Sequence, residues 1–199
     1  MASRRPLFGL LLAGLCAAAL PAFAQSKHVR GTVESLSGDD LMVKSSDGQS
    51  VTVKLAPDWA ATAVVPSELA AIKQGTFVGI ATSGPEDHLV AKEVLVFPPA
   101  MKGAGEGHYA WDLGSQSMMT NATVDGELTQ SNGRELTLSY KGGQSKVTVP
   151  PEVPVVTFGP GDRSMVKPGA KVFITPKADN GTLTASRVLV GKDGLTPPM

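Results

Sequence analysis

The chain has 199 residues, of which 42% are hydrophobic and 18% are charged, with 18 basic and 18 acidic side chains. Because the charge is balanced and only 5% of the residues are aromatic, the sequence lacks both the basic surface and the stacking platform of nucleic-acid binders. The single cysteine, Cys16, lies in the N-terminal segment described next. The chain that follows this segment therefore has no thiol for a disulfide, a nucleophile or a zinc-thiolate site.

The first 24 residues have the pattern of a secretory signal. A pair of arginines precedes an apolar run from Leu7 to Leu20, and Ala22-Phe23-Ala24 supplies small residues for cleavage before Gln25. A membrane span needs about 20 apolar residues, so we expect cleavage, no membrane span, and a periplasmic or secreted protein. The alternative is a lipid anchor on Cys16. A lipoprotein signal would place a small residue directly before the cysteine, but Leu15 occupies that position. Loss of residues 1–24 removes two arginines and no acid, which leaves a net charge of about −2.

The remaining chain contains a tandem repeat, with a first unit over residues 27–98 and a second over residues 121–192. Five blocks match in the same order, which chance does not readily produce. The matched blocks are Val29–Val33 with Val124–Leu128, Asp40–Lys44 with Glu135–Ser139, Gly48–Ser50 with Gly143–Ser145, Ile72–Ile80 with Val166–Ile174, and Leu89–Phe97 with Leu183–Gly191.

Each repeat has the pattern of five short strands. Apolar residues alternate with polar ones, and Gly, Asp, Asn and Ser turns separate the runs. We expect Leu41 and Leu136 to be equivalent core residues, and Val94 and Val188 likewise. A single helical turn capped by Ser67 is predicted between the third and fourth strands of the first repeat.

These strands predict an all-β fold of two tandem five-stranded OB-like small β-barrels, joined by a Gly-rich connector over residues 99–120 and followed by a tail over 193–199. Closure of each barrel would remove exposed strand edges. The competing architecture is a sandwich made jointly by both repeats.

The connector contains the residues that are the best candidates for binding a ligand or a metal ion. Glu106, His108 and Asp112 are candidate ligands for a first-row divalent cation, which accepts mixed imidazole and carboxylate sets. The alternative is that these polar residues hold the junction of the two repeats. No paired histidine motif accompanies them.

Other connector residues have a similar choice of interpretations. Met118 and Met119, with Met101, are either thioether ligands for cuprous ion or fillers of an irregular interface. Trp111 is expected to anchor the connector against a barrel. The hydroxyl residues near His108 lack a nucleophile elbow, so we predict no catalytic residue.

Two further histidines lie outside the connector. His28 precedes the first predicted strand, and His88 lies in a Pro-Glu-Asp-His turn. Both are expected to be solvated loop residues.

The sequence resembles a family of secreted bacterial domains of unknown function with an OB-like barrel. The resemblance is carried by Gly-Thr-Val, Asp-Gly-Gln-Ser-Val-Thr-Val and Ile-Lys-Gln-Gly-Thr-Phe-Val-Gly in the first repeat. The connector motifs Gly-Glu-Gly-His and Met-Thr-Asn-Ala-Thr, and the C-terminal Val188–Met199, are similar to a proteobacterial subgroup often labelled metal ABC transporter permease. A permease would need membrane-spanning elements that this sequence lacks.

The sequence therefore predicts a non-enzymatic periplasmic binding or scaffold module without a cofactor, whose partner is an unknown protein or small ligand. The alternative is a soluble periplasmic accessory in metal-ion handling or transport, with a divalent metal as partner. These two functions differ in whether Glu106, His108 and Asp112 hold a metal.

Overall fold

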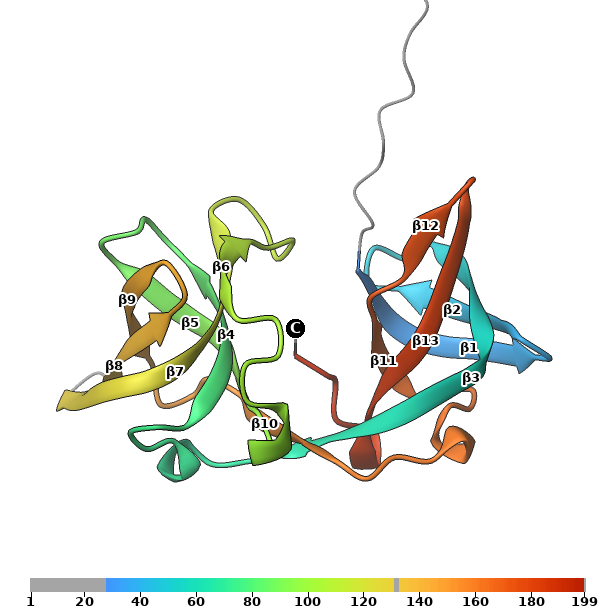
Figure 1. Cartoon of the computed structure of the whole chain (residues 1–199). Coiled ribbons are helices and arrows are strands. Elements are labelled where there is room, and N and C mark those ends of the chain that lie inside the picture. The colour runs from blue at the N-terminus through green and yellow to red at the C-terminus, as the bar shows by residue number, and fades with distance from the viewer. Residues whose placement is uncertain (1–27, 131–132, 199) are drawn as a thin grey trace, which may run out of the picture.

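The computed structural model describes residues 28–130 and 133–198, and the signal-like segment over residues 1–24 lies outside them. The described chain is all-β, as predicted, with thirteen strands (Figure 1). The strands are joined by turns and by four short 3-10 helices, η1 (Leu69–Ala71), η2 (Pro99–Met101), η3 (Arg163–Met165) and η4 (Lys192–Gly194). No helix in this part of the chain is long and apolar enough to cross a membrane. The strands are β1 (Val29–Ser37), β2 (Asp40–Ser45), β3 (Ser50–Pro66), β4 (Phe77–Ser83), β5 (Leu89–Val96), β6 (Gly107–Ala110), β7 (Ser117–Gln130), β8 (Gly133–Tyr140), β9 (Gly143–Val149), β10 (Val155–Gly159), β11 (Lys171–Ile174), β12 (Lys177–Asp179) and β13 (Thr182–Gly191).

Five strands close the first lobe. β1 pairs with β2 and β11, β2 pairs with β3, and β13 joins β11 antiparallel and β3 parallel, so that the pairings form a ring. Alternating residues point inward, as Leu41 and Val43 do on β2, and both are fully buried. They pack with Val188 of β13 in the core of this lobe.

The second lobe closes in the same way. β7 pairs with β4 and β8, β8 pairs with β9, and β5 joins β4 antiparallel and β9 parallel. Its core contains Leu136 and Val94, which are fully buried. The predicted equivalence of Leu41 with Leu136, and of Val94 with Val188, as inward-facing residues is thus confirmed.

Each ring takes strands from both repeats, which differs from the expectation that residues 27–98 and 121–192 each close a barrel. The first three strands of one repeat close with the last two strands of the other. The physical cause is β3, which does not turn back after Leu55 but continues to Pro66 and carries the chain from the first lobe into the second (Figure 1).

The two lobes are related by an approximate twofold axis at the pairing of β3 with β10. Val64 pairs with Phe158, its own counterpart in the second repeat. The twofold rotation converts the flanking pair Ala63–Gly159 into the flanking pair Val65–Thr157. β10 also pairs in parallel with β5, so one strand joins both rings. A small core of Val64, Leu95, Val156 and Phe173 fills the junction.

The first strands align differently from the sequence match. Val43 and Leu138 are equivalent residues of the two repeats. Val43 pairs with Val33 and Leu138 pairs with Val124, and a bulge follows each of these pairs. Val124 therefore corresponds to Val33 and not to Val29. The β7–β8 hairpin is longer than the β1–β2 hairpin by two residue pairs, and this extra length shifted the sequence match by four residues.

The segments between the repeats are also more ordered than predicted. The connector over residues 99–120 contains η2 (Pro99–Met101), strand β6 and the start of β7. Within the first repeat, the predicted helical turn is present as η1 (Leu69–Ala71). The predicted cap by Ser67 is wrong, because the N-cap residue is Glu68 and no side chain caps the turn.

Candidate functional site

The connector forms a hairpin that lies at the junction of the lobes. β6 pairs with the first residues of β7, from Gly107 opposite Asn121 to Ala110 opposite Met118. The amide of Asn121 donates to the Gly105 carbonyl at 3.1 Å and to the Tyr109 hydroxyl at 3.1 Å. These bonds fix the hairpin on the edge of the second lobe. We call residues 105–121 the central hairpin.

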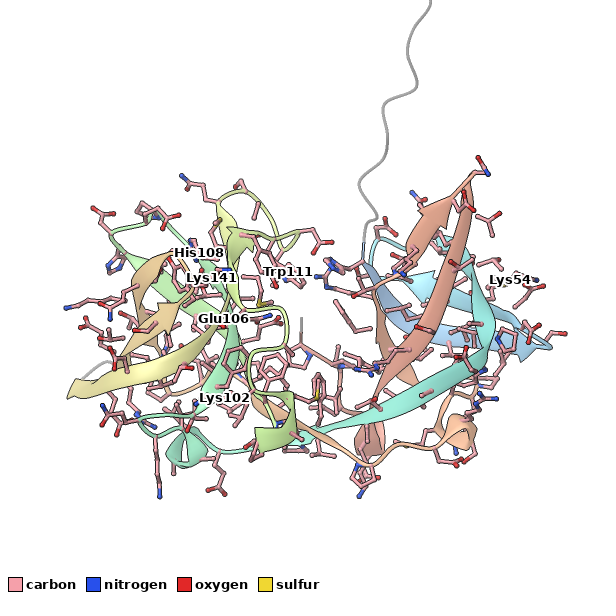
Figure 2. The ribbon with its side chains drawn as sticks, in the orientation of Figure 1. Lys54, Lys102, Glu106, His108, Trp111 and Lys141 are labelled. Carbon is pink, nitrogen blue, oxygen red and sulfur yellow. The ribbon has the colours of Figure 1, made fainter. Side chains whose placement is uncertain are left out.

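The tip of the central hairpin contacts the first lobe. The Trp111 ring lies 4.3 Å from the His28 ring, centroid to centroid, and stacks at 6.4 Å with Phe173 of β11. The Arg30 guanidinium lies 5.0 Å from the Phe173 ring centroid and 5.7 Å from that of Trp111. In Figure 2, Trp111 lies on the side of the hairpin that faces the first lobe. The expectation that Trp111 anchors the connector thus agrees with its contacts.

An ion cluster accompanies this stacking. Asp112 Oδ1 accepts from Arg30 Nη2 at 2.6 Å, and Oδ2 lies 3.0 Å from His28 Nδ1. Burial alone would raise the pKa of the Asp112 carboxyl, but the hydrogen bonds and charges of Arg30 and His28 lower it to about 2. Because the His28 side chain is only 16% exposed, the expectation that it is a solvated loop residue is wrong. His88 is exposed, as expected.

The structure does not bring the predicted metal ligands together. Glu106 Oε1 accepts from the Lys141 backbone amide at 3.1 Å, His108 contacts residues of the second lobe, and Asp112 contacts the first lobe. Within residues 28–130 and 133–198, no group of three His, Cys, Asp or Glu side chains is placed to hold a metal ion. Met118 and Met119 are successive residues of β7, so their thioethers point to opposite faces of the strand.

His108 lies in a polar cluster of the second lobe. Its Nδ1 lies 2.8 Å from Thr120 Oγ1, its Nε2 lies 3.2 Å from Glu86 Oε1, and its ring stacks on Tyr140 at 5.6 Å. The chain of hydroxyl, imidazole and carboxylate is similar to a hydrolase triad. Thr120, however, is fully buried, so its hydroxyl is not exposed to solvent. The cluster is suited to fixing the hairpin.

A pocket of about 130 Å³ opens between the lobes. Its lining combines the central hairpin with both lobes and is mainly apolar and aromatic. The lining residues are Gly79, Leu95, Phe97, Tyr109, Trp111, Met119, Asn121, Phe158 and Phe173. One of these lining residues has an unsatisfied polar atom that is hidden from solvent: the buried indole Nε1 of Trp111 has no hydrogen-bond partner among the described residues. Such a donor costs about 1–3 kcal/mol.

Sequence reasoning missed several residues of this site. His28 directly precedes β1 and Arg30 is its second residue. Phe97, Phe158 and Phe173 are single aromatic residues in separate strands or turns. No local motif links them, because strand exchange alone brings them together. The available signal was a break in the repeat, where Gly79 in one unit matches Phe173 in the other.

Comparisons with family models, with curated proteins and with solved structures gave no significant match. The resemblance to secreted OB-like domains therefore stays a prediction, and the site must be interpreted from its own geometry.

Proposed function

We propose that this protein is an exported, non-enzymatic binding module that holds its ligand between two OB-like barrels which exchange strands. The OB-like description is supported by the order of each ring, in which the first three strands of one repeat are followed by the fifth and fourth of the other. The parallel pairing of third and fifth strands gives the closed, crossed connection of a small Greek-key barrel.

One observation carries the binding function: the aromatic pocket at the junction of the lobes. Ligand sites occur preferentially at domain interfaces, as largely apolar concavities with a few polar groups. This pocket fits that description, because seven of its nine lining residues have apolar or aromatic side chains without charge. The Asn121 amide and the Tyr109 hydroxyl, which are bonded to each other, supply its polar atoms.

The alternative of a metal-handling accessory rests on Glu106, His108 and Asp112. Each of these side chains has its own partners. Glu106 accepts from a backbone amide, His108 contacts a threonine and a glutamate, and Asp112 contacts an arginine and a histidine. Bringing them to one ion would require the hairpin to give up all of these bonds. We therefore favour the binding module over the metal accessory.

Export is supported by the signal-like residues 1–24, with cleavage before Gln25. Intact mass of the exported protein should correspond to a chain that begins at Gln25. A mass that retains acylated Cys16 would refute the proposed compartment and the cleavage site.

The binding function is tested by photo-crosslinking in the exporting cell. A benzophenone amino acid replaces Tyr109, which lines the pocket and is 39% exposed. The matched control replaces Met42 of the first lobe, which is also 39% exposed and does not line the pocket. We expect a discrete small-molecule adduct at position 109 and none at position 42. Equal labelling at both positions, or none at 109, would contradict a ligand site between the lobes.

A further inference from the structure

A second pocket is lined by residues of the first lobe alone. Its volume is about 630 Å³, which lies within the range of roughly 300–1,000 Å³ that is usual for small-molecule sites. Its walls are the loop that contains η3, the start of β11, and the end of β13 with η4. It shares no lining residue with the pocket between the lobes. We call it the lysine pocket.

The charged residues of this lining are three lysines and one acid. They are Lys167 in the turn before β11, Lys171 at the start of β11, and Lys192 and Asp193 of η4. Within residues 28–130 and 133–198, no carboxylate lies within ion-pair distance of the three ammonium groups. The lining therefore has two positive charges in excess, and a cleft lined mainly by one sign of charge attracts the opposite sign.

One of these lysines is held in place by the barrel. Lys171 pairs with Thr32 of β1, and its Nζ donates to the Thr32 hydroxyl at 2.7 Å. The next residue, Val172, is buried in the core of the first lobe, so the Lys171 side chain lies on the outer face of β11. An ammonium group has three donors. The bond to Thr32 uses one of them and leaves two for a ligand.

The second lobe contains a turn of the same construction. The Gly169 amide donates to the Val33 carbonyl, and the Gly75 amide donates to the Val124 carbonyl. Because Val33 and Val124 are equivalent, the turns that precede β11 and β4 are counterparts. The two lobes can therefore be compared residue by residue at this place.

The charge of the lysine pocket belongs to the first lobe only. One lysine is common to both repeats, and the other two are replaced in the second lobe by a phenylalanine and a proline. The replacing phenylalanine packs against a second ring, at 5.2 Å between centroids. An uncharged pair of residues thus satisfies the same barrel, and the fold does not require the two additional lysines. The aligned pairs are Lys167 with Lys73, Lys171 with Phe77, and Lys192 with Pro98.

We infer that the lysine pocket binds a phosphate monoester. Such a group has a charge of roughly −1.5 to −2 at neutral pH, which matches the two excess positive charges of the lining. Lysine is a common phosphate ligand, since its ammonium group is a compact charge with several donors. Met165 and Val190 in the same lining supply apolar surface for the organic part of the ester. This site is separate from the pocket between the lobes and does not depend on the function proposed for that pocket.

The test in solution compares glycerol 3-phosphate with glycerol, which lacks only the phosphoryl group. Each compound is titrated into the whole exported protein, and amide resonances are followed by NMR. We expect saturable shifts of Ala170, Lys171 and Gly191, which all line the pocket, with glycerol 3-phosphate and none with glycerol. Added salt should weaken the binding, because it screens the charges.

Variants locate the binding. Lys171→Gln, Lys192→Gln and Lys167→Gln should each weaken it by about threefold to tenfold, the effect of one charge-assisted hydrogen bond. The matched control is Lys73→Gln, which removes the same charge at the counterpart of Lys167 and should leave the affinity unchanged. Asp193→Asn removes the acid and should tighten binding by about twofold to fivefold. If Lys171→Gln disturbs β11, Lys192→Gln remains usable, since Lys192 is exposed.

Vesicles distinguish a lipid headgroup from a free ester. Phosphatidic acid carries a phosphate monoester, and phosphatidylglycerol carries an anionic diester. Sedimentation with phosphatidic acid vesicles that Lys192→Gln reduces would assign the ligand to a lipid, and binding of glycerol 3-phosphate alone would assign it to a soluble ester; both results support the site. Absence of both, equal binding of phosphatidylglycerol vesicles or of glycerol, unchanged binding in all three lysine variants of the pocket, or an equal loss in Lys73→Gln would each overturn the inference.

Discussion

Replacement of Trp111 tests how the central hairpin joins the lobes. Trp111→Ala removes a ring that contacts His28, Phe173 and Tyr109, and a Trp→Ala change in a core costs about 3–5 kcal/mol. Trp111 is only partly buried, and its loss also removes an unsatisfied N–H that costs about 1–3 kcal/mol. We therefore expect a net loss of about 1–3 kcal/mol, or a melting temperature lower by roughly 3–10 °C.

Trp111→Phe separates the two contributions. It keeps an aromatic ring and removes the N–H, so the loss should be below about 1 kcal/mol. Urea denaturation followed by circular dichroism measures both variants. Trp59 is the matched control: it is 7% exposed in the core of the first lobe, so Trp59→Ala should cost about 3–5 kcal/mol. An unchanged stability of Trp111→Ala would refute the anchoring role, and equal losses for Phe and Ala at position 111 would show that the indole N–H is bonded.

Four further predictions address the ion cluster, the metal question, the cores and the strand exchange. Because Asp112 has its pKa lowered to about 2 from about 3.9 in the unfolded chain, its contribution to stability is present above pH 4 and is lost as the pH falls toward 2; Asp112→Asn should flatten the unfolding free energy over that window, and parallel pH curves would contradict this. Zinc, copper or manganese should shift the melting temperature of wild type and of His108→Ala alike, whereas a metal-specific stabilisation that His108→Ala abolishes would restore the metal site. Leu41→Ala and Leu136→Ala should each cost about 2–4 kcal/mol in chemical denaturation, since both side chains are fully buried; a negligible loss at either position would contradict its core placement. Proteolytic cleavage after the exposed Lys102 should leave the two fragments associated in size-exclusion chromatography, because each ring needs strands from both, and separation into folded monomers would refute the exchange.

The exchange of strands has a consequence for how the protein unfolds. Neither lobe has a complete ring within one repeat, and β10 pairs with strands of both rings. Opening either ring exposes strand edges in both repeats. We therefore expect a single cooperative unfolding transition for the described part of the chain.

The sequence alone determined the strand content and most of the inward-facing positions. Alternation of apolar residues has a period of two, which only a strand matches, so Leu41, Leu136, Val94 and Val188 could be placed in cores without knowing which strands surround them. Local glycine and asparagine turns likewise defined the hairpins.

Only the tertiary structure decided which strands close with which. A repeat that folds on itself and one that exchanges strands bury the same residues in the same pairings, so their hydrophobic patterns are identical. The difference lies in whether the chain turns back after Leu55 or continues straight to Pro66. The pocket follows from that choice, because Gly79 and Phe173 meet at one junction only when the two repeats share both rings.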